Sequence, residues 1–159
     1  MKNYILLFTV ILQLSGCARL DLMPANAKTI MEEVRRKKGT HAVLLNIWAT
    51  SCAPCVAEFP EIVELGNNNK KLHVLFVSTD FEEYKNQVKQ FLQKNNVRGK
   101  SFIKQQKDQE FINGLHSDWS GALPFTILFA KNSGNVVDYW EGSQPKTRFI
   151  TAVHQAISL

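Results

Sequence analysis

The residues best suited to chemistry in this chain are two cysteines three positions apart, in the run Cys52-Ala-Pro-Cys55. An apolar run precedes them and a helical pattern follows, so the pair is predicted to lie where a buried strand ends and a helix begins. The first turn of a helix has unpaired N–H groups and the positive end of the helix dipole, which favour the thiolate form of a cysteine. Pro54 fits this turn, where no N–H is needed. Two thiols so placed can attack a disulfide and then resolve the mixed disulfide that forms.

Other uses of the cysteine pair have weaker support in the sequence. The chain has three cysteines, and the third, Cys17, lies near the N-terminus. A structural bridge between Cys52 and Cys55 would close a very small loop and stabilise the fold little. A zinc site would need two further ligands, and the four histidines show no ligand spacing. We therefore expect redox chemistry and no metal site.

Residues 1–16 have the pattern of a secretory signal peptide. A basic start precedes an apolar stretch that is too short for an ordinary membrane-spanning helix and ends in small residues. An N-terminal membrane anchor is the alternative. Leu14-Ser-Gly-Cys17 resembles the cleavage box of bacterial lipoproteins, which implies cleavage before Cys17 and a lipid on its sulfur. Residues 17–25 would then be the lipidated cysteine and a tether, and Ala18, where inner-membrane lipoproteins of enterobacteria commonly carry Asp, favours the outer membrane.

Residues 26–159 amount to one domain. The formal net charge of the whole chain is +5, and its positive residues are spread out, with one short run, Arg35-Arg36-Lys37-Lys38. Such a run is typical of a solvated helix end, where cations complement the helix dipole. A basic stripe with interleaved aromatic residues would indicate nucleic-acid binding, and the sequence lacks one. We expect no nucleic-acid partner, and membrane contact through the lipid anchor only.

The hydrophobic pattern predicts an α/β fold. Helical spacing marks residues 25–38, 53–65, 82–95, 108–115 and a last helix opened by Pro145. Apolar runs predict strands at residues 41–49, 72–78, 101–104, 125–130 and 136–141, the last two forming a hairpin. Strand–helix–strand units imply a parallel core with right-handed crossovers, to which the hairpin adds antiparallel strands. We expect a central mixed sheet of four to five strands, flanked by helices on both faces.

Two separated motifs resemble those of thioredoxin-fold proteins. They are Trp48-Ala-Thr-Ser-Cys52-Ala-Pro-Cys55 and, about seventy residues later, Ala122-Leu123-Pro124-Phe125-Thr126. The finer pattern resembles the TlpA/ResA-like thiol–disulfide oxidoreductases, which are often exported and membrane-tethered. Their pattern is matched by Asn46-x-Trp48-Ala49-Thr50, by Cys55-x-x-Glu58-Phe59-Pro60 and by Val77-Ser78-x-Asp80. The resemblance covers residues 30–157 and implies a thioredoxin fold.

The resemblance assigns roles to both motifs. It implies that Cys52 is the nucleophile, that Cys55 is the resolving thiol and that the two form a redox disulfide. It implies a cis peptide bond before Pro124, which is rare unless the structure enforces it. In the family, this bond turns the backbone of the preceding residue, here Leu123, to pair with an extended substrate segment. The alternative for Pro124 is an ordinary trans turn before a strand.

The resemblance also implies a proton-exchanging glutamate, Glu58, one turn along the helix from Cys55. A carboxylate facing a partly buried pair would have a raised pKa; a solvated helix glutamate is the alternative. Thioredoxins proper keep a buried aspartate where this chain has Asn46, which cannot shuttle protons and is interpreted as a hydrogen-bonding core residue. Ser51 replaces the usual large aromatic before the first cysteine, which opens the substrate rim. Trp48 is expected to pack beneath the site and to contact substrate together with Ser51, Leu123 and Pro124.

The expected function is reduction of disulfides in exported proteins. Ala53 and Pro54 supply no charge and no imidazole to the pair, unlike strongly oxidising sites, and this favours a reductant. The sequence shows no flavin or nicotinamide site, so we expect no cofactor and an electron-donor partner, a membrane reductase. Clients would be disulfide-bearing envelope proteins, among them apocytochrome c during cytochrome c maturation. The expected location is a bacterial membrane, with the domain facing the periplasm.

Two other function classes remain as alternatives. The first is a peroxide reductase on the same fold. Peroxiredoxins place Thr three residues before the peroxidatic cysteine and Pro four before that Thr, where this chain has Ala49 and Leu45. The second is a non-enzymatic client-binding module, for which both cysteines would be dispensable.

Trp119 is expected either to line the substrate groove or to be a core residue.

Overall fold

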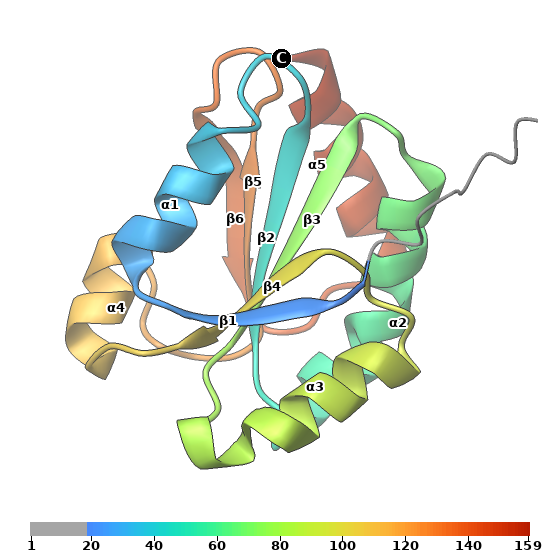
Figure 1. Ribbon diagram of the computed structural model, residues 1–159. Helices are drawn as coiled ribbons and strands as arrows, with labels where there is room; N and C mark the ends of the chain where they lie inside the picture. Colours follow the sequence, from blue (N-terminus) through green and yellow to red (C-terminus); the bar gives the residue numbers. More distant parts are fainter. Residues whose placement is uncertain (1–18) are drawn as a thin grey trace, which may run out of the picture.

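Six strands form a single mixed sheet in the computed structural model, which describes residues 19–159 (Figure 1). The signal peptide and the lipidated Cys17 predicted above lie outside the described residues. The strand order is β1-β4-β3-β2-β5-β6. The strands are β1 (Asp21–Ala25), β2 (Ala42–Trp48), β3 (Leu72–Ser78), β4 (Lys100–Lys104), β5 (Phe125–Phe129) and β6 (Val136–Glu141). The first four strands of this order run parallel, and β5 and β6 form the predicted antiparallel hairpin.

Helices cover both faces of the sheet. They are α1 (Ala27–Arg35), α2 (Ala53–Asn68), α3 (Lys85–Lys94), α4 (Asp108–Leu115) and α5 (Lys146–Ser158), with a short 3-10 turn, η1 (Glu82–Tyr84), before α3. The side chains of α1 and α4 share one buried cluster, and those of α2, α3 and α5 share another. Among residues 19–159, none of these helices is both long and apolar enough to span a bilayer.

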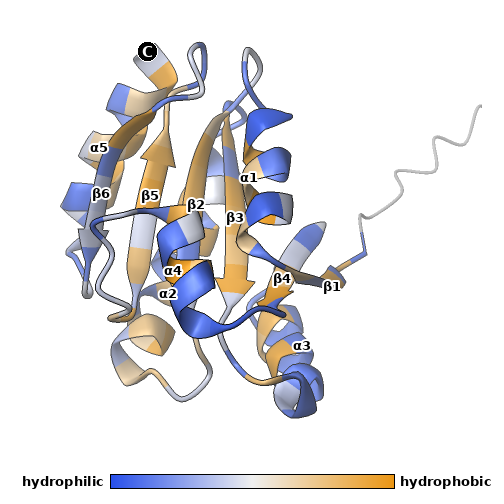
Figure 2. Cartoon of the chain, turned by 90° about the vertical axis from the view of Figure 1, so that its left-hand side faces the viewer, coloured by the Kyte–Doolittle hydropathy of each residue, from blue (hydrophilic) through white to orange (hydrophobic). Residues whose placement is uncertain are grey.

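The central strand β2 joins the two buried clusters. All seven of its residues are buried. Alternate side chains of a strand point to opposite faces, so Leu44 and Trp48 face α2 and α3, whereas Leu45 and Ile47 face α1 and α4. Figure 2 shows the apolar residues concentrated along the central strands and the hydrophilic ones on outward helix faces. This burial fixes the end of β2, from which the redox loop leaves.

The strand β1 corrects the sequence-based prediction of a sheet with four to five strands and a tether through residue 25. Asp21–Ala25 pairs in parallel with β4, and the backbone N–H of Asp21 donates to the carbonyl of Gly99 at 2.9 Å. The segment has no β-branched residue and contains Pro24, so it lacks a strand signal. Proline is tolerated at a sheet edge, where no ladder hydrogen bond is lost. The folded sheet therefore begins at Asp21 and not at residue 26.

The remaining elements follow the predicted order. The helix after the redox loop runs through Pro60, whose side chain is exposed, and ends at Asn68 instead of residue 65. The helix α1 begins later than predicted because Asn26 caps it, its side chain accepting from the backbone N–H of Thr29 at 2.9 Å. Residues 82–95 divide into η1 and α3.

Candidate active site

Cys52 and Cys55 lie at the start of α2 and form a disulfide, with their Cα atoms 5.3 Å apart. Cys52 is the N-cap, and its Sγ accepts from the backbone N–H of Cys55 at 3.3 Å. The two sulfurs are not equally accessible: Cys55 is 1% exposed, whereas Cys52 is only partly buried. An approaching thiol or disulfide therefore meets Cys52 first.

Asp80 fixes the loop that carries Cys52. Its carboxylate accepts from the backbone N–H of Thr50 at 2.9 Å, from the Thr50 hydroxyl at 2.6 Å and from the Ser78 hydroxyl at 2.6 Å. The backbone N–H of Asp80 donates in turn to Ser78 Oγ at 3.0 Å. The ends of β2 and β3 are thus tied together directly before the cysteines. Sequence reasoning noted Asp80 only as part of a family pattern, because its partner Thr50 lies on another loop.

Glu58 is buried, at 4% exposed, so the alternative of a solvated helix glutamate is wrong. Asn46 Nδ2 lies 3.5 Å from Glu58 Oε1 and donates to Thr126 Oγ1 at 3.1 Å. The backbone N–H of Gln144 donates to Glu58 Oε2 at 3.3 Å. Burial raises the pKa of Glu58, and the hydrogen bonds from Gln144, Ser143 and Asn46 oppose that rise. The carboxyl group is therefore biased toward its protonated form.

The loop before β5 contains a cis peptide bond between Leu123 and Pro124, the geometry that the family resemblance implies. Trp119 holds this loop from below. Its Nε1–H donates to the carbonyl of Ala122 at 2.8 Å, and its ring stacks on Phe125 with 4.9 Å between centroids. Trp119 thus combines the two roles considered for it, since it is buried and also lines a hollow beside Leu123.

Trp48 does not lie at the substrate surface. It is fully buried and packs against Phe59 and Phe91, with ring centroids 4.8 and 4.7 Å away. As the last residue of β2, it points into the layer of α2 and α3. The prediction that Trp48 contacts substrate is therefore corrected: Trp48 supports the redox loop from the core. Ser51, by contrast, is exposed.

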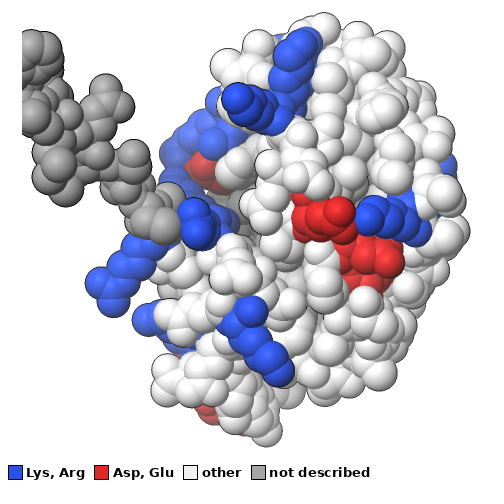
Figure 3. Space-filling model, turned by 90° about the vertical axis from the view of Figure 1, so that its right-hand side faces the viewer, with Lys and Arg blue, Asp and Glu red and all other residues white. Residues whose placement is uncertain are grey.

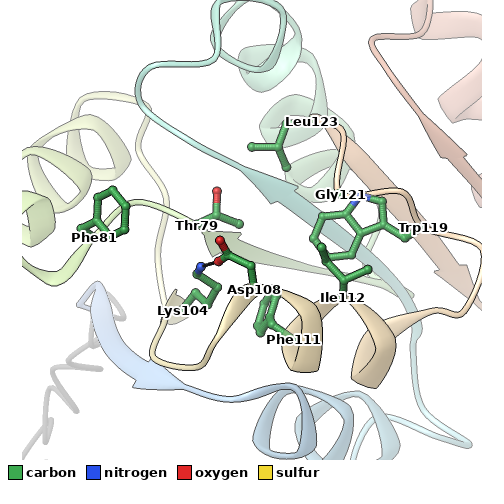
Figure 4. Close-up of a pocket in the computed structure, with 9 residues that line it drawn as sticks. All are labelled: Thr79, Phe81, Lys104, Asp108, Phe111, Ile112, Trp119, Gly121 and Leu123. Carbon is green, nitrogen blue, oxygen red and sulfur yellow. Dashed lines mark hydrogen bonds and ion pairs between the residues drawn. The ribbon is translucent and has the colours of Figure 1, made fainter.

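Two adjoining hollows flank the Leu123 side chain. One, of about 470 Å³, extends from Ser51 to Tyr84, and the other, of about 210 Å³, reaches Trp119 and α4. Thr79, Phe81 and Leu123 line both. Figure 4 shows Thr79 between Phe81 and Leu123, with the Lys104–Asp108 ion pair below them. Phe81 is 67% exposed, so the ridge between the hollows is apolar and accessible beside the redox loop.

Comparison with solved structures identifies the fold. A thiol:disulfide interchange protein of the thioredoxin family from Chlorobium tepidum aligns over 74% of this chain and 81% of its own, with a TM-score of 0.62 and 20% identity. A DsbF homologue from Corynebacterium diphtheriae aligns over 77% of this chain and 75% of its own, with a TM-score of 0.63 and 20% identity. At this identity, the likeness establishes a thioredoxin-like α/β fold.

Sequence comparison identifies the family. The thiol-disulfide oxidoreductase ResA of Bacillus cereus (strain ZK / E33L) is 33% identical over 114 residues, which cover 72% of this chain and 62% of ResA. The ResA of Bacillus anthracis matches with the same identity and coverage. The chain thus spans less than two thirds of the length of these relatives. The model of the Redoxin family matches residues 23–153, which include both cysteines, Glu58 and Pro124. This protein therefore belongs to the Redoxin family.

Proposed function

We propose that this protein is a thiol–disulfide oxidoreductase of the cell envelope that reduces disulfides of exported proteins. The observation that carries the proposal is the disulfide at the start of α2, in which Cys52 is accessible and Cys55 is 1% exposed. A resolving thiol shielded in this way reacts with its neighbour before it reacts with anything in solution. The ResA relatives, which are named thiol-disulfide oxidoreductases, support the same chemistry.

The reaction transfers two electrons from the reduced pair to a client. The Cys52 thiolate attacks one sulfur of the client disulfide, forming a mixed disulfide and releasing a client thiolate, which takes up a proton. The Cys55 thiolate then attacks Cys52 Sγ. This step closes the Cys52–Cys55 disulfide and releases the second client thiolate. A dithiol partner, which we propose is a membrane reductase, must then reduce the pair.

Glu58 is the group proposed to exchange a proton with the pair. It lies one helical turn from Cys55, on the same side of α2. Burial raises its pKa, so the carboxyl group can hold a proton under conditions in which an exposed glutamate would have lost it. Asn46, which replaces the buried aspartate of thioredoxins, donates hydrogen bonds and cannot carry the proton itself.

The client is proposed to lie against the ridge formed by Phe81 and Leu123. An extended segment beside Leu123 would place its disulfide over Cys52, and Ser51 leaves room for a bulky neighbour. Apocytochrome c is one proposed client, and other disulfide-bearing envelope proteins are also compatible with an open, apolar groove. The leader pattern and Leu14-Ser-Gly-Cys17 support lipid anchoring at Cys17, and Ala18 favours the outer membrane.

Insulin reduction tests the redox proposal. The wild-type chain should reduce insulin disulfides in the presence of a dithiol donor, and Cys52→Ser should lose this activity completely. Cys55→Ser should instead accumulate a mixed disulfide through Cys52, which mass spectrometry would identify in envelope extracts. Undiminished insulin reduction by Cys52→Ser would overturn the proposal. Rapid peroxide consumption by the reduced wild type in stopped flow, without insulin reduction, would favour the peroxide reductase.

A further inference from the structure

Charge is distributed unequally between the two ends of the sheet. Cys52 follows the carboxyl end of β2, and we call this end of the sheet the redox end. Acidic residues gather there, in the segments that follow β3 and β4, before β5 and at the end of β6. They are Asp80, Glu82, Glu83, Asp108, Glu110, Asp118 and Glu141. Lysines occur there too: Lys85 and Lys104 form ion pairs with Glu82 and Asp108, and Lys28 and Lys107 are exposed.

The opposite end, where the parallel strands begin, is basic. We call it the basic end and define it by Arg19, Lys38, Lys70, Lys71, Lys94, Arg98, Lys100 and Lys131. Figure 3 shows Lys and Arg side chains around the point where the chain enters the described domain, and a patch of Asp and Glu side chains set away from it. Asp21 and Glu33 are acidic residues at this end, and Glu33 is buried and paired with Arg36 and Lys100.

Hydrogen bonds and shared hollows make the basic end continuous. The backbone N–H of Ala42 donates to the carbonyl of Lys71, and that of Gly39 donates to the carbonyl of Lys131. Lys70, Lys71 and Lys131 line one hollow with Asn68 and Asn69. The adjoining hollow contains Asn68 as well, with Lys94, Asn95, Asn96 and one acidic residue, Glu64, which forms an ion pair with Lys146. The residues between the cations are largely neutral amides.

The cations of this surface are free to meet an external anion. Within residues 19–159, Lys70, Lys71, Lys94 and Arg98 take part in no ion pair, and all four are exposed. Exposed cations without a protein partner are screened by salt and attract any nearby anionic surface. The arrangement therefore fits a broad, negatively charged partner better than a single small anion.

The strand β1 brings this surface close to the proposed lipid anchor at Cys17, a placement that rests on the proposed lipidation. Asp21 is hydrogen-bonded to Gly99, beside Arg98 and Lys100. The four residue steps from Cys17 to Asp21 span at most about 14 Å when fully extended. A lipid on Cys17 would therefore hold the start of β1 within about two screening lengths of the lipid headgroups, one screening length being about 8 Å at physiological salt.

We propose that the basic end docks onto anionic phospholipid headgroups and thereby turns the redox end away from the bilayer. The seven residues of β2 place Cys52 roughly 23 Å along the strand direction from the basic end. The expectation of membrane contact through the lipid anchor alone is thus extended to a second, electrostatic contact. The occupant is the membrane itself, and the clients that reach Cys52 are water-soluble domains.

Acetylation of lysines in vesicles tests the docking. The full chain, produced with its leader and purified from membranes, is placed in vesicles of phosphatidylcholine alone or mixed with phosphatidylglycerol. Acetylation of Lys70 and Lys71 should be slower by about five-fold in the anionic vesicles, and high salt should restore the rate. Lys28 and Lys107, exposed at the redox end, should react equally in both.

Two charge-matched double variants make the test specific. Lys94→Glu/Arg98→Glu should lose the protection of Lys70 and Lys71, whereas Lys28→Glu/Lys107→Glu should keep it, and both should reduce insulin normally in detergent. Equal acetylation of Lys70 and Lys71 in the two vesicle types, or full protection in Lys94→Glu/Arg98→Glu, would overturn the docking. Intact mass reports separately whether Cys17 is lipidated, and insulin reduction reports separately on the redox function.

Discussion

Asn46 Nδ2 lies 3.5 Å from the buried Glu58 carboxylate, so the residue that replaces the thioredoxin aspartate contacts the proposed proton carrier directly. Asn46 also donates to Thr126 on the neighbouring strand β5. This arrangement connects the centre of the sheet to the first turns of α2. It supports a site in which the amide orients the carboxyl group and the carboxyl group holds the proton.

Glu58→Gln should slow insulin reduction by about ten- to hundred-fold, because the proton-exchanging group is lost while the shape is kept. It should also change the pH dependence of stability. Burial raises the pKa of Glu58 in the folded state, so the wild type loses stability as pH rises from the ordinary carboxyl pKa through this raised value.

Urea denaturation across that pH range checks the change. The loss of stability should be absent in Glu58→Gln and should persist in Glu61→Gln, an exposed residue on the same helix whose charge makes only a small contribution to the raised pKa of Glu58. Wild-type activity in Glu58→Gln at every pH would exclude a proton-transfer role for Glu58.

Asp80→Asn should destabilise the fold by about 2 kcal/mol, since hydrogen bonds to a charged acceptor contribute about 1.5–3 kcal/mol each and Asn offers one acceptor oxygen in place of two. The variant should also loosen the loop that carries Thr50 and Cys52, so alkylation of reduced Cys52 should change in rate. Denaturant midpoints and iodoacetamide kinetics measure the two effects. Glu82→Gln, exposed on η1, serves as the control, and equal stability of both variants would contradict the role given to Asp80.

Phe81→Asp should raise KM for insulin by about ten-fold, because an exposed aromatic on a contact ridge contributes over 1 kcal/mol when it anchors a partner. The rate with a small-molecule disulfide, which needs no ridge, should stay unchanged. Steady-state kinetics with both substrates separate the two outcomes. Val136→Asp, at an exposed apolar position at the start of β6 and at the opposite end of the sheet from the cysteines, should leave both rates unaffected. An unchanged KM in Phe81→Asp would show that clients bind elsewhere.

His73 should make the fold acid-sensitive. Burial lowers the pKa of His73 from 6.5 to about 4, so the folded state keeps it neutral while the unfolded chain takes up a proton. Its stabilising contribution is therefore complete above pH 6.5 and is lost as pH falls toward about 4. Thermal unfolding across this range should show a shallower decline in His73→Gln than in the wild type. The exposed His154→Gln should follow the wild type; a parallel decline in all three proteins would refute the assignment.

Local patterns in the sequence were sufficient to predict the redox loop and most of the order of helices and strands. The Cys52-Ala-Pro-Cys55 run and Leu123-Pro124 are short motifs whose geometry depends on neighbouring residues. The strand β1 escaped prediction because its partner β4 lies about eighty residues away and its own residues have no strand pattern. Edge pairing of this kind is decided by tertiary packing, not by propensity.

The environment of Glu58 shows the same limit at the site itself. Its contact with Gln144 joins residues 86 positions apart, on a loop with no distinguishing composition. The Asp80–Thr50 connection likewise spans two loops. The inward direction of Trp48 follows from the strand's alternation, but which face holds α2 and α3 depends on the crossover connections. Sequence motifs therefore identify the reacting cysteines, whereas the residues that hold them in place are identified only from the folded structure.

The N–H of Cys55 donates to the sulfur of Cys52, which makes the nucleophile also the cap of α2. The oxidation or reduction of that sulfur and the unfolding of the domain are therefore linked in one thermodynamic cycle. Any preference of the folded domain for a reduced or an oxidised Cys52 must appear, with equal size, as a difference in unfolding free energy between the two forms. The electron-donating tendency of the folded protein, relative to that of its unfolded chain, can thus be measured by calorimetry of the oxidised and reduced forms, with no redox partner in the cell.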